Sequence, residues 1–131
     1  QIPANLARVP LSVNRHTLSK CAWRGVAANG RAFTFELETP LFHGAIFHAD
    51  DKAFYVLLQD PEKILEVPLT TATASARLAW MIGHHHFPVQ IKGNTLRVAD
   101  QAAARRLFAQ EHVCFRERKS VFQPFRPGQP H

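Results

Sequence analysis

Short runs in which apolar and polar residues alternate occupy the first sixty positions of the chain. Phe33, Phe35 and Leu37 fall on one face of an extended segment, and Thr34 and Glu36 fall on the other, as in a half-buried antiparallel strand. An Asn-Gly pair just before this segment signals a tight hairpin turn, because both residues tolerate positive φ. The pattern predicts two hairpins, with strands at 21–26, 32–37, 45–49 and 52–58, after an extended lead-in over 1–16 that pairs with a sheet edge.

The periodicity changes after Asp60-Pro61, where longer helical repeats begin. A strand is predicted at 63–69, and Thr71 or Thr73 can cap the helix that follows. Gly83 is expected to end this helix, since glycine often occupies the position after a helix. The apolar face of the helix is expected to repeat every three to four residues, through Ala72, Ala76, Ala79, Trp80 and Gly83.

A second set of strands and one more helix complete the chain. Two short strands are predicted at 88–91 and 95–98, joined by a Lys-Gly-Asn turn. Asp100 can cap the next helix, and a last strand is predicted at 112–118. The core face of this helix is expected to comprise Ala103, Ala104, Leu107 and Phe108.

The resulting order, β-α-β-β-α-β, is that of the ferredoxin-like fold, in which two helices cover one face of a four-stranded antiparallel sheet. The predicted fold class is therefore α+β. We expect a small N-terminal all-β domain of the partner-binding or peptide-binding type at 1–60, a ferredoxin-like domain for metal binding and dimerisation at 61–127, and a flexible C-terminal tail at 128–131. No apolar run approaches the length of a membrane span, so no membrane contact is expected.

The charge of the chain raises the question of nucleic-acid binding. Sixteen Lys and Arg against ten Asp and Glu give a formal charge of +6, but the only dense cluster of cations lies at 116–119. The strand predicted at 95–98 carries no aromatic residue on which bases could stack. We therefore expect no nucleic acid as partner, and keep as the alternative function a basic ferredoxin-like module that binds RNA or another polyanion. Cys21 and Cys114 form no paired motif and are expected to be buried thiols of a cytoplasmic protein.

The strongest chemical signal is three consecutive histidines, His84, His85 and His86, followed by Phe87 and Pro88. Imidazole is a common protein ligand for nickel, copper and zinc. Consecutive residues of an extended chain point in opposite directions, so His84 and His86 can share one side. One chain cannot easily wrap all three rings around one ion. A metal would need further ligands, and the same triplet on a symmetry-related subunit is the nearest source.

Two other interpretations of the histidines stand beside the metal site. A histidine in the last turn of a helix is favoured by the helix dipole, so the triplet is equally compatible with a solvated surface corner. A hydrolytic metalloenzyme ranks below both, because no Asp or Glu lies between Ala72 and Ile91 to act as general base. His48, which is close to Asp50 and Asp51, is interpreted as part of a tight turn, where aspartates have backbone roles.

The corner around the triplet resembles the UreE family of urease accessory proteins. Four segments carry the resemblance: the helix before the corner, the corner itself, the strand that follows it and a segment near the end of the chain. The matching residues are Ala76 to Trp80, then Gly83, His86, Pro88, Gln90 and Ile91, then Leu96-Arg97, and finally Pro124-Phe125-Arg126-Pro127.

This resemblance implies a homodimer in which His86 of each subunit binds Ni²⁺ at the interface. It also implies a metallochaperone rather than an enzyme, which delivers nickel for maturation of the urease active site in the cytoplasm. The implied partners are the accessory GTPase UreG and the urease apoprotein assembly complex. Zn²⁺ and Cu²⁺ are expected to bind as well. The family commonly has Asn-Arg where this chain has His84-His85, so His84 is a candidate extra ligand, and His131 in the tail is another.

If the helix before the triplet forms the dimer contact, Trp80, Met81 and Phe87 are candidate apolar anchors, because aromatic residues and Met are enriched in interface cores. Trp80 is equally well placed to be an ordinary core residue, since it continues the stripe from Ala72 and Ala76.

Overall fold

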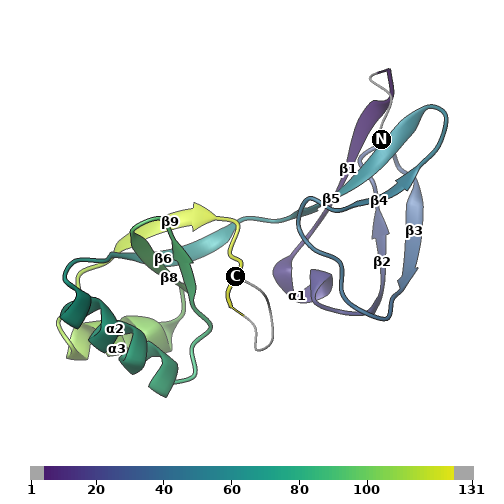
Figure 1. Cartoon of the computed structure of the whole chain (residues 1–131). Coiled ribbons are helices and arrows are strands. Elements are labelled where there is room, and N and C mark those ends of the chain that lie inside the picture. The colour runs from purple at the N-terminus through teal and green to yellow at the C-terminus, as the bar shows by residue number, and fades with distance from the viewer. Residues whose placement is uncertain (1–4, 126–131) are drawn as a thin grey trace. The chain divides into compact units, whose positions relative to one another are not determined.

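The computed structural model describes residues 5–125, and the chain divides into two compact units, Gln1–Asp60 and Pro61–His131 (Figure 1). Strands outnumber helices in both units, so the predicted α+β class is confirmed. None of the helices in the described part has the length and apolar character needed to cross a membrane.

The first unit contains a three-stranded sheet in the order β1-β5-β4 and a separate hairpin of β2 and β3. Both predicted hairpins are confirmed, and β1 lies at a sheet edge, parallel to β5. The short helix α1 was not predicted, although Asn14 caps it by accepting a hydrogen bond from the Thr17 N–H at 2.8 Å. The elements are β1 (Ala7–Val13), α1 (Arg15–Leu18), β2 (Ala22–Val26), β3 (Ala32–Glu36), β4 (Ile46–Ala49) and β5 (Ala53–Gln59).

In the turn between β4 and β5, the predicted backbone role of the aspartates is confirmed for Asp50. The Asp50 carboxylate accepts hydrogen bonds from the backbone N–H groups of Lys52 and Ala53, each at 2.8 Å. These bonds favour the charged form and lower the pKa of Asp50 below its ordinary value. The His48 ring packs beside Tyr55, with 5.6 Å between the ring centroids. His48 therefore belongs to the aromatic packing of this unit.

The second unit is a four-stranded antiparallel sheet in the order β7-β8-β6-β9. Both helices lie on the same face of this sheet (Figure 1). The elements are β6 (Glu62–Pro68), α2 (Ala72–His84), β7 (Gln90–Lys92), β8 (Thr95–Ala99), α3 (Ala102–Gln110) and β9 (Arg116–Ser120).

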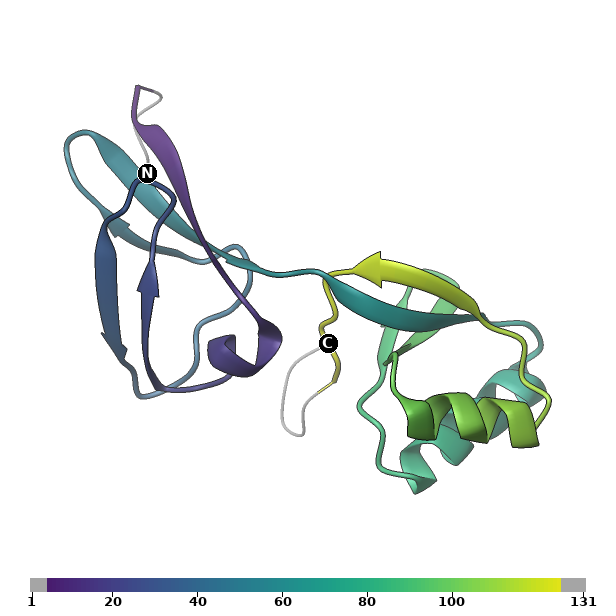
Figure 2. The same cartoon turned by 180° about the vertical axis from the view of Figure 1, so that it is seen from behind.

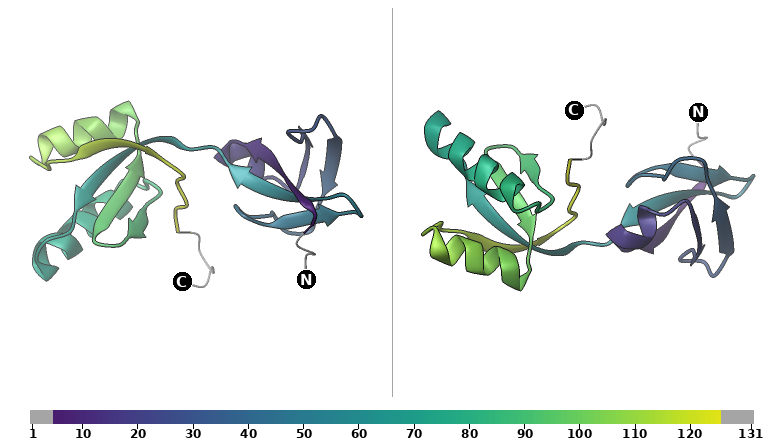
Figure 3. Two further views of the ribbon diagram at one scale, coloured as in Figure 1. Left: turned by 90° about the horizontal axis from the view of Figure 1, so that it is seen from above. Right: turned by 90° about the horizontal axis from the view of Figure 1, so that it is seen from below.

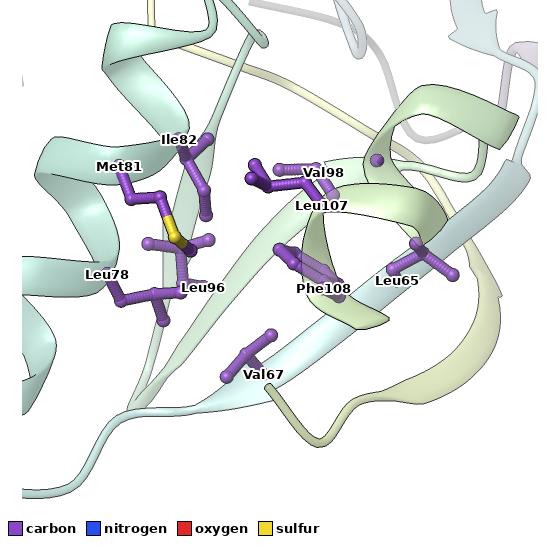
Figure 4. Close-up of a cluster of buried hydrophobic side chains, with 10 residues drawn as sticks. Leu65, Val67, Leu78, Met81, Ile82, Leu96, Val98, Leu107 and Phe108 are labelled. Atoms are coloured by element: carbon purple, nitrogen blue, oxygen red, sulfur yellow. The ribbon is translucent and has the colours of Figure 1, made fainter. Parts of the chain in front are cut away.

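The buried face of α2 differs from the predicted one. Leu78, Met81 and Ile82 point from the helix into the core, toward Leu96 and the other apolar side chains of the sheet (Figure 4). The large aliphatic side chains gain more from burial than alanine and glycine, because the gain scales with apolar area. The predicted face was wrong, because the prediction counted small residues as equal to large aliphatic ones. The five residues of that face are all exposed, namely Ala72, Ala76, Ala79, Trp80 and Gly83.

The core face of α3 was predicted correctly except for Ala103, which is only half-buried, and the predicted cap is wrong. Ala104, Leu107 and Phe108 are buried. Asp100 does not cap the helix, because it accepts two hydrogen bonds from Arg105, from Nε at 2.7 Å and from Nη2 at 2.9 Å. These bonds from the guanidinium lower the pKa of the Asp100 carboxyl. Asp100 therefore pairs with a charged side chain instead of capping the helix.

The prediction that both cysteines are buried is wrong. Cys21 and Cys114 are both free and exposed. Cys21 precedes β2, and Cys114 lies in the segment between α3 and β9, so both thiols are in connections, which run over the surface of a domain.

Candidate metal site

The helix before the histidine triplet ends in a Schellman motif that puts His86 in the left-handed region, with φ 61°. The N–H of His86 donates to the Gly83 carbonyl at 3.0 Å, and the N–H of Phe87 donates to the Ile82 carbonyl at 3.3 Å. Glycine usually takes this position, because a side chain costs roughly 1 kcal/mol there. The expectation that Gly83 ends the helix is therefore wrong, since α2 continues through Gly83 and turns three residues later.

The backbone of the triplet is not extended. His84 is the last residue of α2, and His85 caps the helix with φ −88° and ψ 6°. The expectation that His84 and His86 share one side assumed an extended chain, so its premise is wrong. All three side chains are exposed, which leaves their nitrogens accessible to an ion in solution.

Stacked rings fix two of the three imidazoles. The His84 ring stacks on the Trp80 indole, with 5.0 Å between centroids and 15° between planes. His85 lies edge-on to His84 at 5.5 Å and stacks on Phe87 at 6.3 Å. Within residues 5–125, His86 takes part in none of these ring contacts.

A single chain does not complete a metal site in the part that the structure describes. No group of three His, Cys, Asp or Glu side chains within residues 5–125 could hold an ion. His131 lies outside the described residues. His43 is used structurally, because its Nδ1 accepts a hydrogen bond from the backbone N–H of Gln59 at 2.9 Å. A metal at the triplet would thus need donors from outside this set.

An exposed apolar surface lies next to the triplet. Trp80, 68% exposed, stands on the side of α2 that faces away from the core, together with the small residues of the wrongly predicted face. We call the exposed residues Ala72, Ala76, Ala79, Trp80 and Gly83 the α2 outer face. Met81 is only 8% exposed and belongs to the core, so its predicted place among exposed interface anchors is wrong. Phe87 is half-buried and packs against the same core.

The left-handed position of His86 could have been found in the sequence. A Schellman motif commonly places an apolar residue two positions after the helix cap, with proline soon after it. Phe87 and Pro88 satisfy this pattern and would have set the helix end at His85 instead of Gly83.

Comparison with known proteins finds a matching family and individual proteins that are similar to this chain. A family model described as the UreE urease accessory protein, C-terminal domain, matches residues 62–130. The urease accessory protein UreE of Ruegeria pomeroyi is 32% identical over 122 residues, which make up 92% of this chain and 76% of that protein. The protein of the same name from Beijerinckia indica is 29% identical over 103 residues, 77% of this chain. The match spans 58% of the length of the Beijerinckia protein.

Proposed function

This chain belongs to the UreE family of urease accessory proteins, and on that premise we propose that it is a metallochaperone that delivers Ni²⁺ for maturation of the urease active site. The family is one of accessory proteins and not of enzymes, in agreement with the expectation from the sequence. Nickel is the cargo of the protein in this proposal, so the site must capture the ion and also release it.

The observation that carries the proposal is the group of three exposed imidazoles at the end of α2, one of which, His84, stacks on the exposed Trp80. The ring of His86 is exposed and takes no part in these stacks, so its nitrogens are accessible to an ion. Exposed imidazoles bind borderline metals such as Ni²⁺ and exchange them more readily than a closed thiolate cage. His86 is therefore assigned as the principal nickel ligand, with His84 and His131 as additional donors, and the same set will also take Zn²⁺ or Cu²⁺.

The second part of the proposal is a homodimer with His86 from each subunit at the interface. One chain offers too few donors within residues 5–125, and a two-fold partner supplies the same donors again. The α2 outer face adjoins His84 and carries the exposed Trp80, so it is the proposed contact surface. Tryptophan is enriched in interface cores, and its exposure in the single chain excludes the alternative of a core role there.

Fold, partners and location complete the proposal. The element order and the strand order β7-β8-β6-β9 support a ferredoxin-like fold for the second unit, after an N-terminal domain made mainly of strands. The partners are the accessory GTPase UreG and the urease apoprotein assembly complex, and the location is the cytoplasm.

Nickel titration with the oligomeric state measured in parallel tests the proposal. We expect one tightly bound Ni²⁺ per two chains by calorimetry, and a dimer by sedimentation. Trp80→Asp should give monomers and lose the tight site, because a charge is costly to bury in an apolar contact. Phe42→Asp is the matched control, since Phe42 is also an exposed aromatic residue, at 67%, and lies in the other unit. A monomer that binds one ion per chain would contradict the dimer site.

A further inference from the structure

The two edges of the sheet in the second unit differ in what lies beside them. Near β7 the chain returns after β9, and the Phe125 N–H donates to the Val89 carbonyl at 2.8 Å. The Gln123 N–H also donates to Gln90 Oε1 at 3.1 Å. At the other edge, β9 is bonded to β6 on one side, and no strand of residues 5–125 pairs with its other side. Figure 2 and Figure 3 show β9 along this margin of the sheet. An open edge presents backbone N–H and C=O groups to a further strand.

β9 contributes two of the three arginines that surround one buried carboxylate of β6, and the third comes from β8. Glu66, 1% exposed, accepts hydrogen bonds from Arg97 Nε at 2.8 Å and Arg116 Nη2 at 2.5 Å, and Arg118 Nη1 lies 3.7 Å away. Burial raises the pKa of Glu66, but the bonds from Arg116 and Arg97 outweigh it, so the pKa lies below its ordinary value. One negative charge thus faces three guanidinium groups.

Two hollows lie along the same strand. One, of about 390 Å³, is mainly apolar and is lined by Pro68, Cys114, Phe115 and Arg116, at the start of β9. The other, of about 290 Å³, is lined only by charged residues, which come from β6, β9, α3 and the connection before α3. They are Lys63, Asp100, Arg105, Glu117, Arg118 and Lys119.

The cations of the charged hollow are not balanced by its carboxylates. Arg105 binds Asp100 through two nitrogens and also binds Glu117, so both carboxylates are already engaged. Lys63 and Lys119 stand directly opposite each other in the register of β6 and β9. Neither lies within salt-bridge distance of a carboxylate in residues 5–125, although the charge of Lys63 helps to lower the pKa of Asp100. Like charges directly opposite across a strand pair are destabilising without a counter-charge. The hollow is therefore suited to a carboxylate supplied from outside.

We propose that the open edge of β9 docks an extended acidic segment of a partner protein. The segment adds a strand to the sheet, and it places an apolar side chain in the hollow at Phe115 and a carboxylate in the charged hollow that Lys63 and Lys119 line. Phe115 and Lys119 are four residues apart, which in a strand is about 13 Å, so the apolar and acidic side chains of the partner should be spaced by about four residues. Backbone pairing gives affinity, and the two hollows give specificity, as in other strand-addition complexes.

The charges on the strand select this occupant over others. A second copy of the chain would bring Arg116, Arg118 and Lys119 against the same three cations, which is electrostatically unfavourable. A nucleic acid would use the cations, but it would use neither the backbone edge nor the apolar hollow. The inference does not depend on nickel binding, because none of its residues lies in the triplet.

Binding of a synthetic peptide tests the inference. The probe is a twelve-residue Thr-rich peptide with one Val and, four residues later, a pair of Glu residues, and its binding is followed by fluorescence anisotropy and by hydrogen exchange of the β9 amides. We expect binding together with slower exchange in β9. Changing the Glu pair of the peptide to Gln, or its Val to Ser, should each weaken binding about tenfold.

Protein variants locate the site. The double variant Lys63→Gln and Lys119→Gln should weaken binding about tenfold, whereas the matched double variant Lys20→Gln and Lys92→Gln, with the same change in net charge, should leave it unaltered. Equal weakening in both pairs would show unspecific attraction and overturn the inference, as would absence of binding at millimolar peptide. A single-stranded oligonucleotide that protects the β9 amides as well as the peptide does, or dimerisation through β9 in sedimentation, would also overturn it.

Discussion

Both helices of the second unit end in the same backbone motif with a histidine at the same position. His86 after α2 has φ 61°, and His112 after α3 has φ 55°. At the end of α3 the His112 N–H donates to the Ala109 carbonyl at 3.4 Å and the Val113 N–H to the Phe108 carbonyl at 2.8 Å, which repeats the pattern described for α2. In each case the next residue is apolar and packs against the core of this unit.

The surroundings of the two histidines differ. His86 follows two further imidazoles, one of which stacks on the exposed Trp80, whereas His112 follows Gln110 and Glu111. The comparison teaches that a histidine in the left-handed position marks a helix cap and does not by itself mark a metal site. The assignment of nickel binding to one end rests on the neighbouring imidazoles, the adjoining apolar surface and the family match, which the following experiments separate.

The largest expected difference between the two ends is in nickel affinity. His86→Gly should weaken tight nickel binding at least about 100-fold, which corresponds to about 2.7 kcal/mol, because it removes a ligand and keeps the cap. His112→Gly should change affinity less than about threefold. Calorimetry in competition with a chelator measures both. Equal losses at the two ends would show that the end of α3 takes part in binding, and no loss at either would remove His86 from the site.

The second difference concerns stability and should be the same at both ends. Glycine fits a left-handed position better than alanine by roughly 1 kcal/mol. The variants with glycine at position 86 or 112 should therefore be more stable than the corresponding alanine variants, His86→Ala and His112→Ala, by about that amount. Urea unfolding without metal measures the differences. A gap at one end alone would mean that the two caps do not hold their histidines in the same way.

Only part of the fold could be predicted from the sequence. The hairpins of the first unit and the element order of the second were predictable, because alternation, turn residues and changes of period are local properties of the chain. The orientation of α2 was not, because two apolar stripes compete on one helix and the areas that they bury against the sheet decide between them. In the single chain, Leu78 and Ile82 are buried and Trp80 is exposed.

For the candidate site, the identity of the residues was predictable and their geometry was not. The three consecutive histidines can be found from the sequence alone. The direction in which each ring points from the backbone depends on where the helix ends. That end was set at Gly83 by residue type, whereas the bonds of the motif form three residues later, at His86. The buried pair of Glu66 and Arg97 was also not foreseen, since its partners are 31 residues apart in the sequence.

A smaller effect is expected from the other two imidazoles at the end of α2. His84→Ala and His85→Ala should each weaken nickel binding by no more than about fivefold, because their rings are held in stacks with Trp80 and Phe87 and act as additional donors at most. Glu111→His at the end of α3 is the reciprocal change and should create no tight site, since that end lacks the apolar contact surface. Calorimetry of the three variants beside the native protein checks this. If His84→Ala matches His86→Gly in its loss, the two histidines are ligands of equal rank.

The smallest expected effect is that of the end of the chain. His131 lies outside the described residues and is proposed as an additional donor to the site formed by His86. A nickel ligand must be deprotonated, so protons compete with the metal, and affinity should fall as the pH falls through the range in which histidines ordinarily titrate, roughly pH 7 to 5. Each histidine that takes part adds one proton to this competition and steepens the fall. Deleting residues 128–131 should therefore lower affinity at pH 7.5 by about two- to threefold and make its pH dependence shallower by about one proton. The same deletion in His112→Gly should have the same effect, because the end of α3 does not contribute. Titrations at several pH values decide, and superimposable curves for the full-length and shortened chains would exclude His131 as a ligand while leaving the comparison of the two helix ends unchanged.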